Sequence, residues 1–91
     1  MLKDFAKLHT FLTVIKEKSF SKASSKLGIS QPAVTQHIKF IEEYLDTKIV
    51  ERKKNGTVLT KEGVDLFRIA TKLEKAINNS ERKLLKIISK E

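Results

Sequence analysis

The sequence predicts a mostly α-helical fold, a winged helix-turn-helix with three helices and a two-stranded β-wing, followed by a long C-terminal linker helix. Three observations support this. Apolar residues recur at spacings of three and four along most of the chain, which is the period of an amphipathic helix. That period breaks only between residues 48 and 60, where two short β-branched runs flank an Asn-Gly pair, a strong hairpin signal. The breaker residues each fall near an expected boundary, and they are Pro32, Gly28, Gly56 and Gly63.

The first two helices are expected over residues 4–17 and 20–27. Asp4 stands where a negative charge favours a helix N-terminus. Ser19 is expected to cap the second helix, because its hydroxyl can accept a hydrogen bond from an unpaired backbone N–H. Gly28 suits the left-handed conformation that often ends a helix. The expected apolar stripes are Phe5, Leu8, Phe11, Leu12 and Ile15 in the first helix and Phe20, Ala23 and Leu27 in the second.

The third helix is expected to begin at Ser30-Gln31-Pro32 and to end near residues 44–46. Ser30 is a good N-cap, and Pro32 falls in the first turn, where its missing N–H costs nothing. One side of this helix is expected to be buried through Val34, Ile38, Ile41 and Leu45. The opposite side, which we call the reading face, carries Gln31, Pro32, Thr35, Gln36 and Lys39.

The wing is expected to pair residues 49–52 with residues 57–60 around the turn Lys53-Lys54-Asn55-Gly56. Thr60 is then expected to cap the last helix, with Glu62 favourably placed in its first turn. Asn78-Asn79-Ser80 weakens the middle of that helix without breaking it. Its apolar residues alternate spacings of four and three, which favours pairing with another helix. This apolar seam consists of Leu66, Ala70, Leu73, Ile77, Ser80, Leu84 and Ile87.

The composition favours a polyanionic partner. The chain has 91 residues with 19 basic and 11 acidic side chains, a net charge of +8. Nucleic acid is the leading candidate and an anionic membrane surface the second, although a lysine-rich soluble surface has the same composition. The absence of cysteine excludes disulfides, thiolate metal sites and thiol catalysis. The apolar runs are too short to span a membrane, and the N-terminus does not resemble a signal peptide.

The reading face has chemistry suited to the major groove of double-stranded DNA. Glutamine can bond both N6 and N7 of adenine, and Thr or Pro can contact a thymine methyl group. Lys39 could reach a base or a phosphate. The wing cations Arg52, Lys53 and Lys54 suit phosphate or minor-groove contact. Weaker backbone candidates lie on the second helix, namely Ser19, Ser21, Lys22 and Lys26. A solvated helix face and a solvated loop remain open alternatives.

Catalysis, metals and cofactors are not expected. His9 and His37 lie on different predicted helices without a second ligand type nearby, so a metal site is disfavoured. His37 could touch DNA or could simply be a surface residue. No nucleophile–base pair, paired carboxylates or phosphate-cradling glycine loop is evident, so we expect no enzyme and no bound cofactor.

The motif residues resemble a LysR-type transcriptional regulator over essentially the whole chain. The resemblance lies in Ser19-Phe20-Ser21-Lys22-Ala23, Leu27, Ser30-Gln31-Pro32-Ala33-Val34-Thr35, Ile38, Leu45, Arg52, Val58-Leu59-Thr60 and Gly63. It implies binding of operator DNA as a homodimer, or a higher oligomer, whose linker helices pair antiparallel. It implies base contacts by Gln31, Pro32, Thr35 and Gln36, and backbone contacts by Ser30, Lys39 and the wing around Arg52. Two positions depart from the family pattern, where His37 replaces a usual Gln and lysines replace wing arginines.

The resemblance further implies a DNA-binding domain over residues 1–60 and a dimerisation helix over residues 61–91. The effector-binding domain of the family, and with it a small-molecule site, would lie outside these residues. A cytoplasmic bacterial protein is expected. A second hypothesis is an interaction module that regulates a full-length relative through mixed dimers. A third, binding of a membrane surface by the basic last helix, is disfavoured because pairing would bury the apolar seam.

Overall fold

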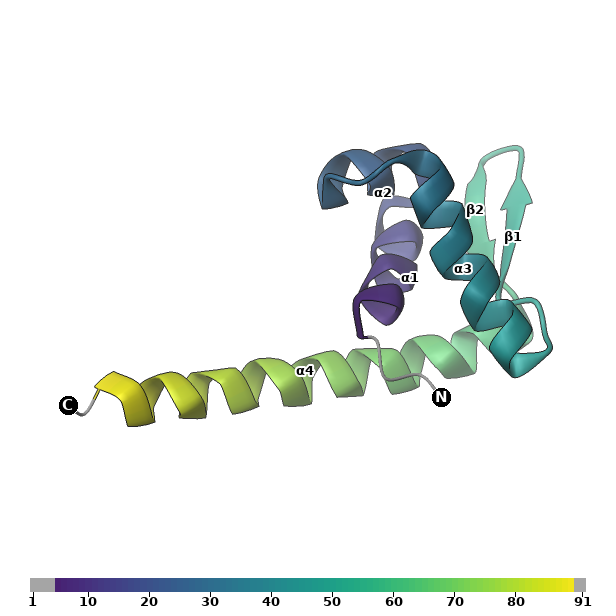
Figure 1. The fold of residues 1–91 in the computed structure, drawn as a ribbon. Coiled ribbons are helices and arrows are strands. Elements are labelled where there is room, and N and C mark those ends of the chain that lie inside the picture. Colours follow the sequence, from purple (N-terminus) through teal and green to yellow (C-terminus); the bar gives the residue numbers. More distant parts are fainter. Residues whose placement is uncertain (1–4, 90–91) are drawn as a thin grey trace.

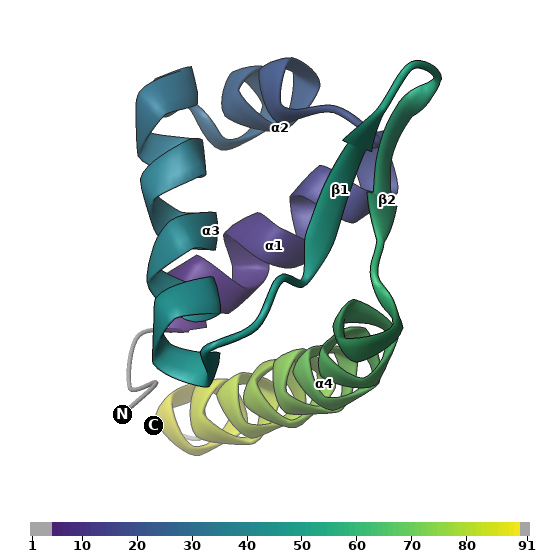
Figure 2. The same ribbon diagram turned by 90° about the vertical axis from the view of Figure 1, so that its right-hand side faces the viewer.

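A computed structural model of the chain describes residues 5–89 and contains the predicted elements in the predicted order. Helices α1 and α2 cross at one end of the domain, α3 packs against both, and the β-hairpin packs through β2 against α1 and α4 (Figures 1 and 2). Helix α4 runs beneath α1 and projects well beyond it (Figure 1). The elements are α1 Phe5–Glu17, α2 Phe20–Leu27, α3 Gln31–Leu45, β1 Val50–Lys53, β2 Gly56–Leu59 and α4 Lys61–Ser89. Asp4, the expected charge at the start of the first helix, lies outside the described residues.

The helix boundaries follow the predicted caps. The Ser19 hydroxyl accepts a hydrogen bond from the backbone N–H of Lys22, and the Ser30 hydroxyl accepts one from that of Ala33. Gly28 ends α2 in the left-handed conformation, with φ 69°. Asp46 ends α3 in the same conformation, with φ 53°, a role that the sequence analysis did not assign to it.

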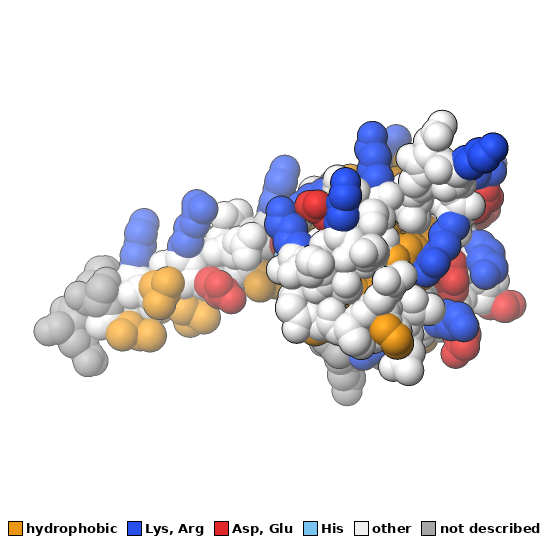
Figure 3. Space-filling model, turned by 90° about the horizontal axis from the view of Figure 1, so that it is seen from above, with side chains coloured by type: hydrophobic (Ala, Val, Ile, Leu, Met, Phe, Trp, Pro, Cys, Tyr) orange, Lys and Arg blue, Asp and Glu red, His pale blue; other side chains and the backbone are white. Residues whose placement is uncertain are grey.

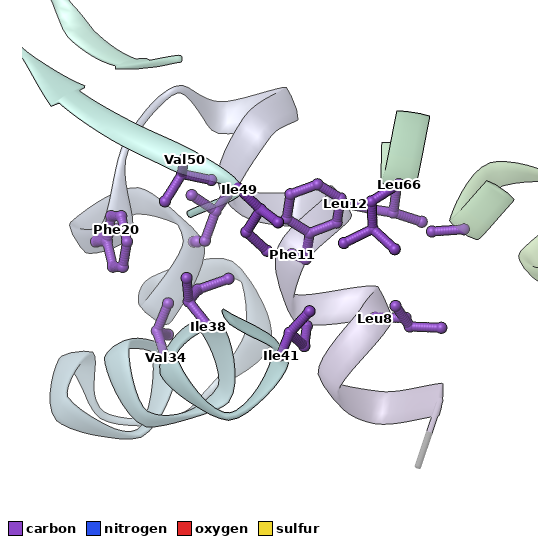
Figure 4. Packing of buried hydrophobic residues seen from close by; sticks show 13 residues of the cluster. Leu8, Phe11, Leu12, Phe20, Val34, Ile38, Ile41, Ile49, Val50 and Leu66 are labelled. Carbon is purple, nitrogen blue, oxygen red and sulfur yellow. The ribbon is translucent and has the colours of Figure 1, made fainter. Parts of the chain in front are cut away.

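The core forms where α1, α2, α3, the start of β1 and the start of α4 meet (Figure 4). Two predicted core positions are wrong, and both are terminal residues of their helices. Phe5, the first residue of α1, is 46% exposed, and Leu45, the last residue of α3, is 39% exposed. At Asp46 the chain turns out of the helix, so the buried stripe of α3 stops at Ile41. The core residues are Leu8, Phe11, Leu12, Val14, Phe20, Ala23, Val34, Ile38, Ile41, Ile49, Val50, Leu66 and Ala70.

The wing is a two-stranded antiparallel hairpin shifted by one residue from its predicted bounds. Val50 pairs with Leu59 and Lys53 pairs with Gly56, so Lys54 and Asn55 form the turn. The Asn-Gly signal therefore located the hairpin, although Gly56 lies in the strand after the turn. There it has φ 124°, and a Cβ at this position would lie 2.9 Å from the Lys18 carbonyl oxygen.

Helix α4 is fastened to the wing before it leaves the domain. The Thr60 hydroxyl donates to the Lys48 carbonyl and accepts from the Gly63 N–H, which confirms Thr60 as the cap. Gly63 lies against the backbone of Ile49, where there is no room for a Cβ. The helix is continuous through Asn78 and Asn79, as predicted. Among residues 5–89 no helix is both long and apolar enough to cross a membrane.

Candidate nucleic-acid interface

The reading face is brought together with the wing on one exposed surface. The polar side of α3 faces outward because the apolar stripe on its other side is buried in the core. A shallow hollow is lined by side chains of both elements. Its lining consists of Gln31, Pro32, Thr35, Gln36, Lys39 and Arg52.

The N-terminus of α3 opens onto this surface. Ser30 serves as its cap, and its hydroxyl oxygen accepts from the Ala33 N–H at 3.1 Å. The unpaired N–H groups of a helix N-terminus favour a negatively charged group such as a phosphate. Pro32 lacks an N–H, and the Ala33 N–H is bonded to the Ser30 hydroxyl, so the first-turn donor left for a ligand is the Gln31 N–H.

The three wing cations have different surroundings. The guanidinium of Arg52 stacks over the Phe20 ring, with its Cζ 3.9 Å from the ring centroid. Lys53 forms an ion pair with Glu51 at 3.0 Å, two residues away along the same strand. Because alternate strand residues face opposite sides, Lys53 and Glu51 lie on the side of the hairpin opposite to Arg52. Lys54 is exposed in the turn.

The weaker backbone candidates on α2 already have structural partners in two cases. Ser19 is the N-cap of α2, and the Lys26 amine lies 3.3 Å from a carboxylate oxygen of Glu17. Ser21 lies beside the wing, in the same depression as Arg52 and Lys54. Ser21 and Lys22 are exposed, so their placement leaves both side chains accessible from outside.

His37 does not belong to the reading face. Its Nδ1 lies 2.8 Å from the hydroxyl oxygen of Thr10, a buried residue of α1. The Thr10 hydroxyl donates to the Ala6 carbonyl, so it accepts from the N–H of His37. His37 thereby joins α3 to α1. Among the described residues, no three potential metal-ligating side chains lie together.

The apolar seam of α4 divides into three parts. Leu66 and Ala70, which we expected to pair with a second chain, are 8% and 1% exposed and lie in the chain's own core. These two residues are therefore not available to pair with a second chain, because α1 already covers them. Leu73 and Ile77 line a groove between α4 and α1, whereas Leu84 and Ile87 are 59% and 67% exposed. Figure 3 shows hydrophobic side chains along one flank of the projecting part of α4 and Lys or Arg side chains along the other.

Two contacts in the structure have no counterpart in the sequence pattern. One is the stacking of Arg52 on Phe20, a residue that the pattern places only in the apolar stripe of α2. The other is the hydrogen bond from His9 Nδ1 to Glu74 Oε2 at 2.7 Å, which joins α1 to α4 at the groove. A signal for His37 was present, since it lies three residues after Val34 and four before Ile41, at the edge of the buried stripe.

Comparison with known proteins identifies a matching family and related transcriptional regulators. Residues 5–64 match the family described as "Bacterial regulatory helix-turn-helix protein, lysR family". The HTH-type transcriptional regulator CitR of Bacillus subtilis (strain 168) is 39% identical over 84 residues, which cover 92% of this chain and 29% of CitR. An uncharacterized HTH-type transcriptional regulator of Methanocaldococcus jannaschii, MJ0300, is 42% identical over 84% of this chain and 25% of its own length. The chain thus spans less than a third of the length of these relatives.

Solved structures share the fold over nearly the whole chain. The chain in the crystal structure titled "BenM_DBD/catB site 1 DNA Complex" superposes with a TM-score of 0.89 at 31% identity, covering 94% of this chain and 97% of that one. The crystal structure of CbnR, a LysR family transcriptional regulator, superposes with a TM-score of 0.82 at 25% identity, covering 88% of this chain and 28% of that chain.

Proposed function

Because the chain belongs to the lysR family of bacterial regulatory helix-turn-helix proteins, we propose that it binds double-stranded DNA sequence-specifically through the reading face and the wing and acts in transcription regulation. The observation that carries the proposal is the convergence of five α3 side chains and Arg52 on one exposed hollow. A structural neighbour at 31% identity, BenM_DBD, was crystallised as a DNA complex, which favours this function over an interaction module.

In the proposed mechanism α3 enters the major groove with its N-terminal half. Gln31 and Gln36 then present amides to base edges, and a good bidentate contact of this kind discriminates by about 1–3 kcal/mol. Pro32 and Thr35 contact the apolar methyl group of thymine, and Lys39 contacts the phosphate backbone farther along the helix. The Gln31 N–H at the start of α3 adds a contact to a phosphate that is independent of sequence.

The wing contributes the second set of contacts. Arg52 borders the same hollow as α3, so it reaches DNA next to the groove that α3 occupies. Lys54 at the turn adds a phosphate contact from the tip. Chromosomal DNA as the ligand places the chain in the compartment that holds the chromosome, the bacterial cytoplasm.

We further propose that two copies pair through the exposed part of α4. One recognition helix offers a small contact surface, and two helices held at a fixed separation read two half-sites. The support is the exposed apolar seam beyond the domain, from Leu73 to Ile87, together with the groove against α1 in which that seam begins. A helix face this apolar is costly to leave in water.

The test is selection of bound duplexes from a random pool, followed by affinity measurements on the selected site. We expect an inverted repeat, and we expect Gln31→Ala to weaken binding by about 1–3 kcal/mol and to relax preference at one position of each half-site. Tyr44→Ala is the matched control, since Tyr44 is exposed on α3 away from the hollow. Recovery of no preferred sequence, or equal effects of the two variants, would overturn the proposed reading face.

A further inference from the structure

We infer that Phe20 is a positioning residue for DNA binding: its ring holds the guanidinium of Arg52 at the border of the reading face. This inference rests on the proposed function. Phe20 is the first residue of α2, where the sequence pattern indicates only a core residue. Phe20 is buried, and the guanidinium of Arg52 stacks on one face of its ring, with Cζ 3.9 Å from the ring centroid.

The geometry of a stacked arginine explains why this contact matters for a ligand. A guanidinium interacts with an aromatic ring through its face, whereas its five N–H donors lie in the plane and point outward from the edge. Within residues 5–89 no acceptor takes a hydrogen bond from the Arg52 guanidinium, and no carboxylate pairs with it. Stacking on Phe20 therefore fixes the direction of the Arg52 side chain and leaves its N–H donors available to a ligand.

The position of the strand under Arg52 is fixed by a second, independent contact. Arg52 pairs with Thr57 across the hairpin, and the Thr57 N–H donates to the Lys18 carbonyl at 3.0 Å. Lys18 comes just before the Ser19 cap of α2, and it is the residue whose backbone leaves no room for a Cβ at Gly56. The wing is thus attached to the α1–α2 connection by its backbone through Thr57 and by a side chain through Phe20.

The neighbouring cation, Lys53, has a charged partner where Arg52 has an aromatic one. Lys53, on the opposite side of the same strand, is paired with Glu51, which competes with any phosphate for its charge. The partner of Arg52 is the uncharged Phe20 ring, so no carboxylate within residues 5–89 competes with a phosphate for the guanidinium. An arginine side chain has about 2 kcal/mol of rotamer entropy. Holding it in place before DNA arrives reduces the part of that entropy that binding must remove.

The experiment is a double-mutant cycle on DNA affinity with Phe20→Leu and Arg52→Ala, measured on the full chain with the duplex selected above. We expect Phe20→Leu to weaken binding by about 3- to 10-fold when Arg52 is present. We expect it to have little effect on affinity when residue 52 is alanine, because there is then no guanidinium to position. Equal losses in the two backgrounds would mean a purely structural role for Phe20 and would overturn the inference.

Two further measurements separate positioning from folding. Phe11→Leu is the matched control, since it replaces another buried aromatic ring, whose aromatic partner is Phe67 of α4 and not a wing cation. It should show no coupling to Arg52→Ala. In the unbound wild-type chain, ring current from Phe20 should shift the NMR signals of the Arg52 Hδ protons upfield. Unshifted signals would overturn the inference even if Phe20→Leu fails to fold.

The outcomes also distinguish this inference from the proposed function. If the wild-type chain binds no duplex, the proposed function fails, and the upfield shift still reports on the stack. If the chain binds DNA and Arg52→Ala binds as well as the wild type, the proposed function survives through α3 and the positioning role of Phe20 is overturned.

Discussion

The imidazole Nδ1 of His9 donates to a carboxylate oxygen of Glu74 at 2.7 Å, joining α1 to α4 at the point where α4 leaves the domain. The His9 side chain is 55% exposed and that of Glu74 29%, so water screens the pair. Its importance is therefore geometric more than energetic. It lies beside the groove where the exposed part of the seam begins, and it connects the two helices that form that groove.

The ion pair between His9 and Glu74 should stabilise the chain by no more than about 1 kcal/mol, as for other exposed pairs. Urea unfolding of the His9→Ala and Glu74→Ala variants, singly and together, measures the coupling energy between the two side chains. The double variant should lose less than the sum of the two single losses. Glu81→Gln, on an exposed part of α4, is the control. Strictly additive losses would show that the two side chains do not stabilise each other.

Gly63→Ala should destabilise the chain, although helix propensity alone predicts a gain of about 1 kcal/mol. The reason is the backbone of Ile49, which occupies the space that a Cβ needs. Overpacking of this kind costs about 1–3 kcal/mol or more. Thermal unfolding measures the sign directly, and Lys61→Ala in the exposed first turn of the same helix is the control. A melting temperature above that of the wild type would contradict the close packing of Gly63 on the wing.

Removing a wing lysine should weaken binding to all duplexes alike. For Lys54→Ala we expect the slope of log affinity against log salt concentration to fall by about one unit, as for one lost phosphate contact. Lys53→Ala should change the slope less, because Glu51 already neutralises part of its charge. Titrations at several salt concentrations compare the two, with Lys75→Ala as a control distant from the wing. A larger effect at Lys53 than at Lys54 would contradict the roles assigned to these side chains.

Polar substitution at the projecting end of α4 tests the proposed pairing of two chains through this helix. Leu84 and Ile87 together should contribute several kcal/mol of burial in a dimer, since a fully buried Leu or Ile is worth about 1.5–3 kcal/mol. The double variant Leu84→Gln with Ile87→Gln should sediment as a monomer at concentrations where the wild type is dimeric. Its affinity for an inverted repeat should fall to that for a half-site. Arg82→Gln, on the side of α4 away from the seam, should stay dimeric.

Periodicity and caps predicted the element order, because helices, turns and caps depend on residues within a few positions of one another. Ser19, Ser30 and Thr60 were predicted as caps, and each accepts the expected backbone N–H. Contacts between residues far apart in sequence left no such signal. Arg52 and Phe20, and likewise His9 and Glu74, meet only because the fold brings different elements together.

The seam shows a second limit of sequence reasoning. Leu66 and Ala70 continue the same four-three spacing as Leu84 and Ile87, so the pattern identifies one apolar face along the whole helix. Periodicity cannot tell whether that face is covered by the same chain or by another. The structure shows that α1 covers its beginning, which leaves only the rest for a partner.

Helix α4 acts as a lever arm, because it packs against α1 as far as Glu74 and then projects as one unbroken helix. Residues 75–89 extend about 22 Å at a rise of about 1.5 Å per residue. A rotation of about 10° where α4 leaves the domain would therefore displace its far end by about 4 Å, more than the ~3.4 Å rise of one base pair. The reverse also holds: a shift of this size imposed at the far end would turn the recognition helix by about 10°.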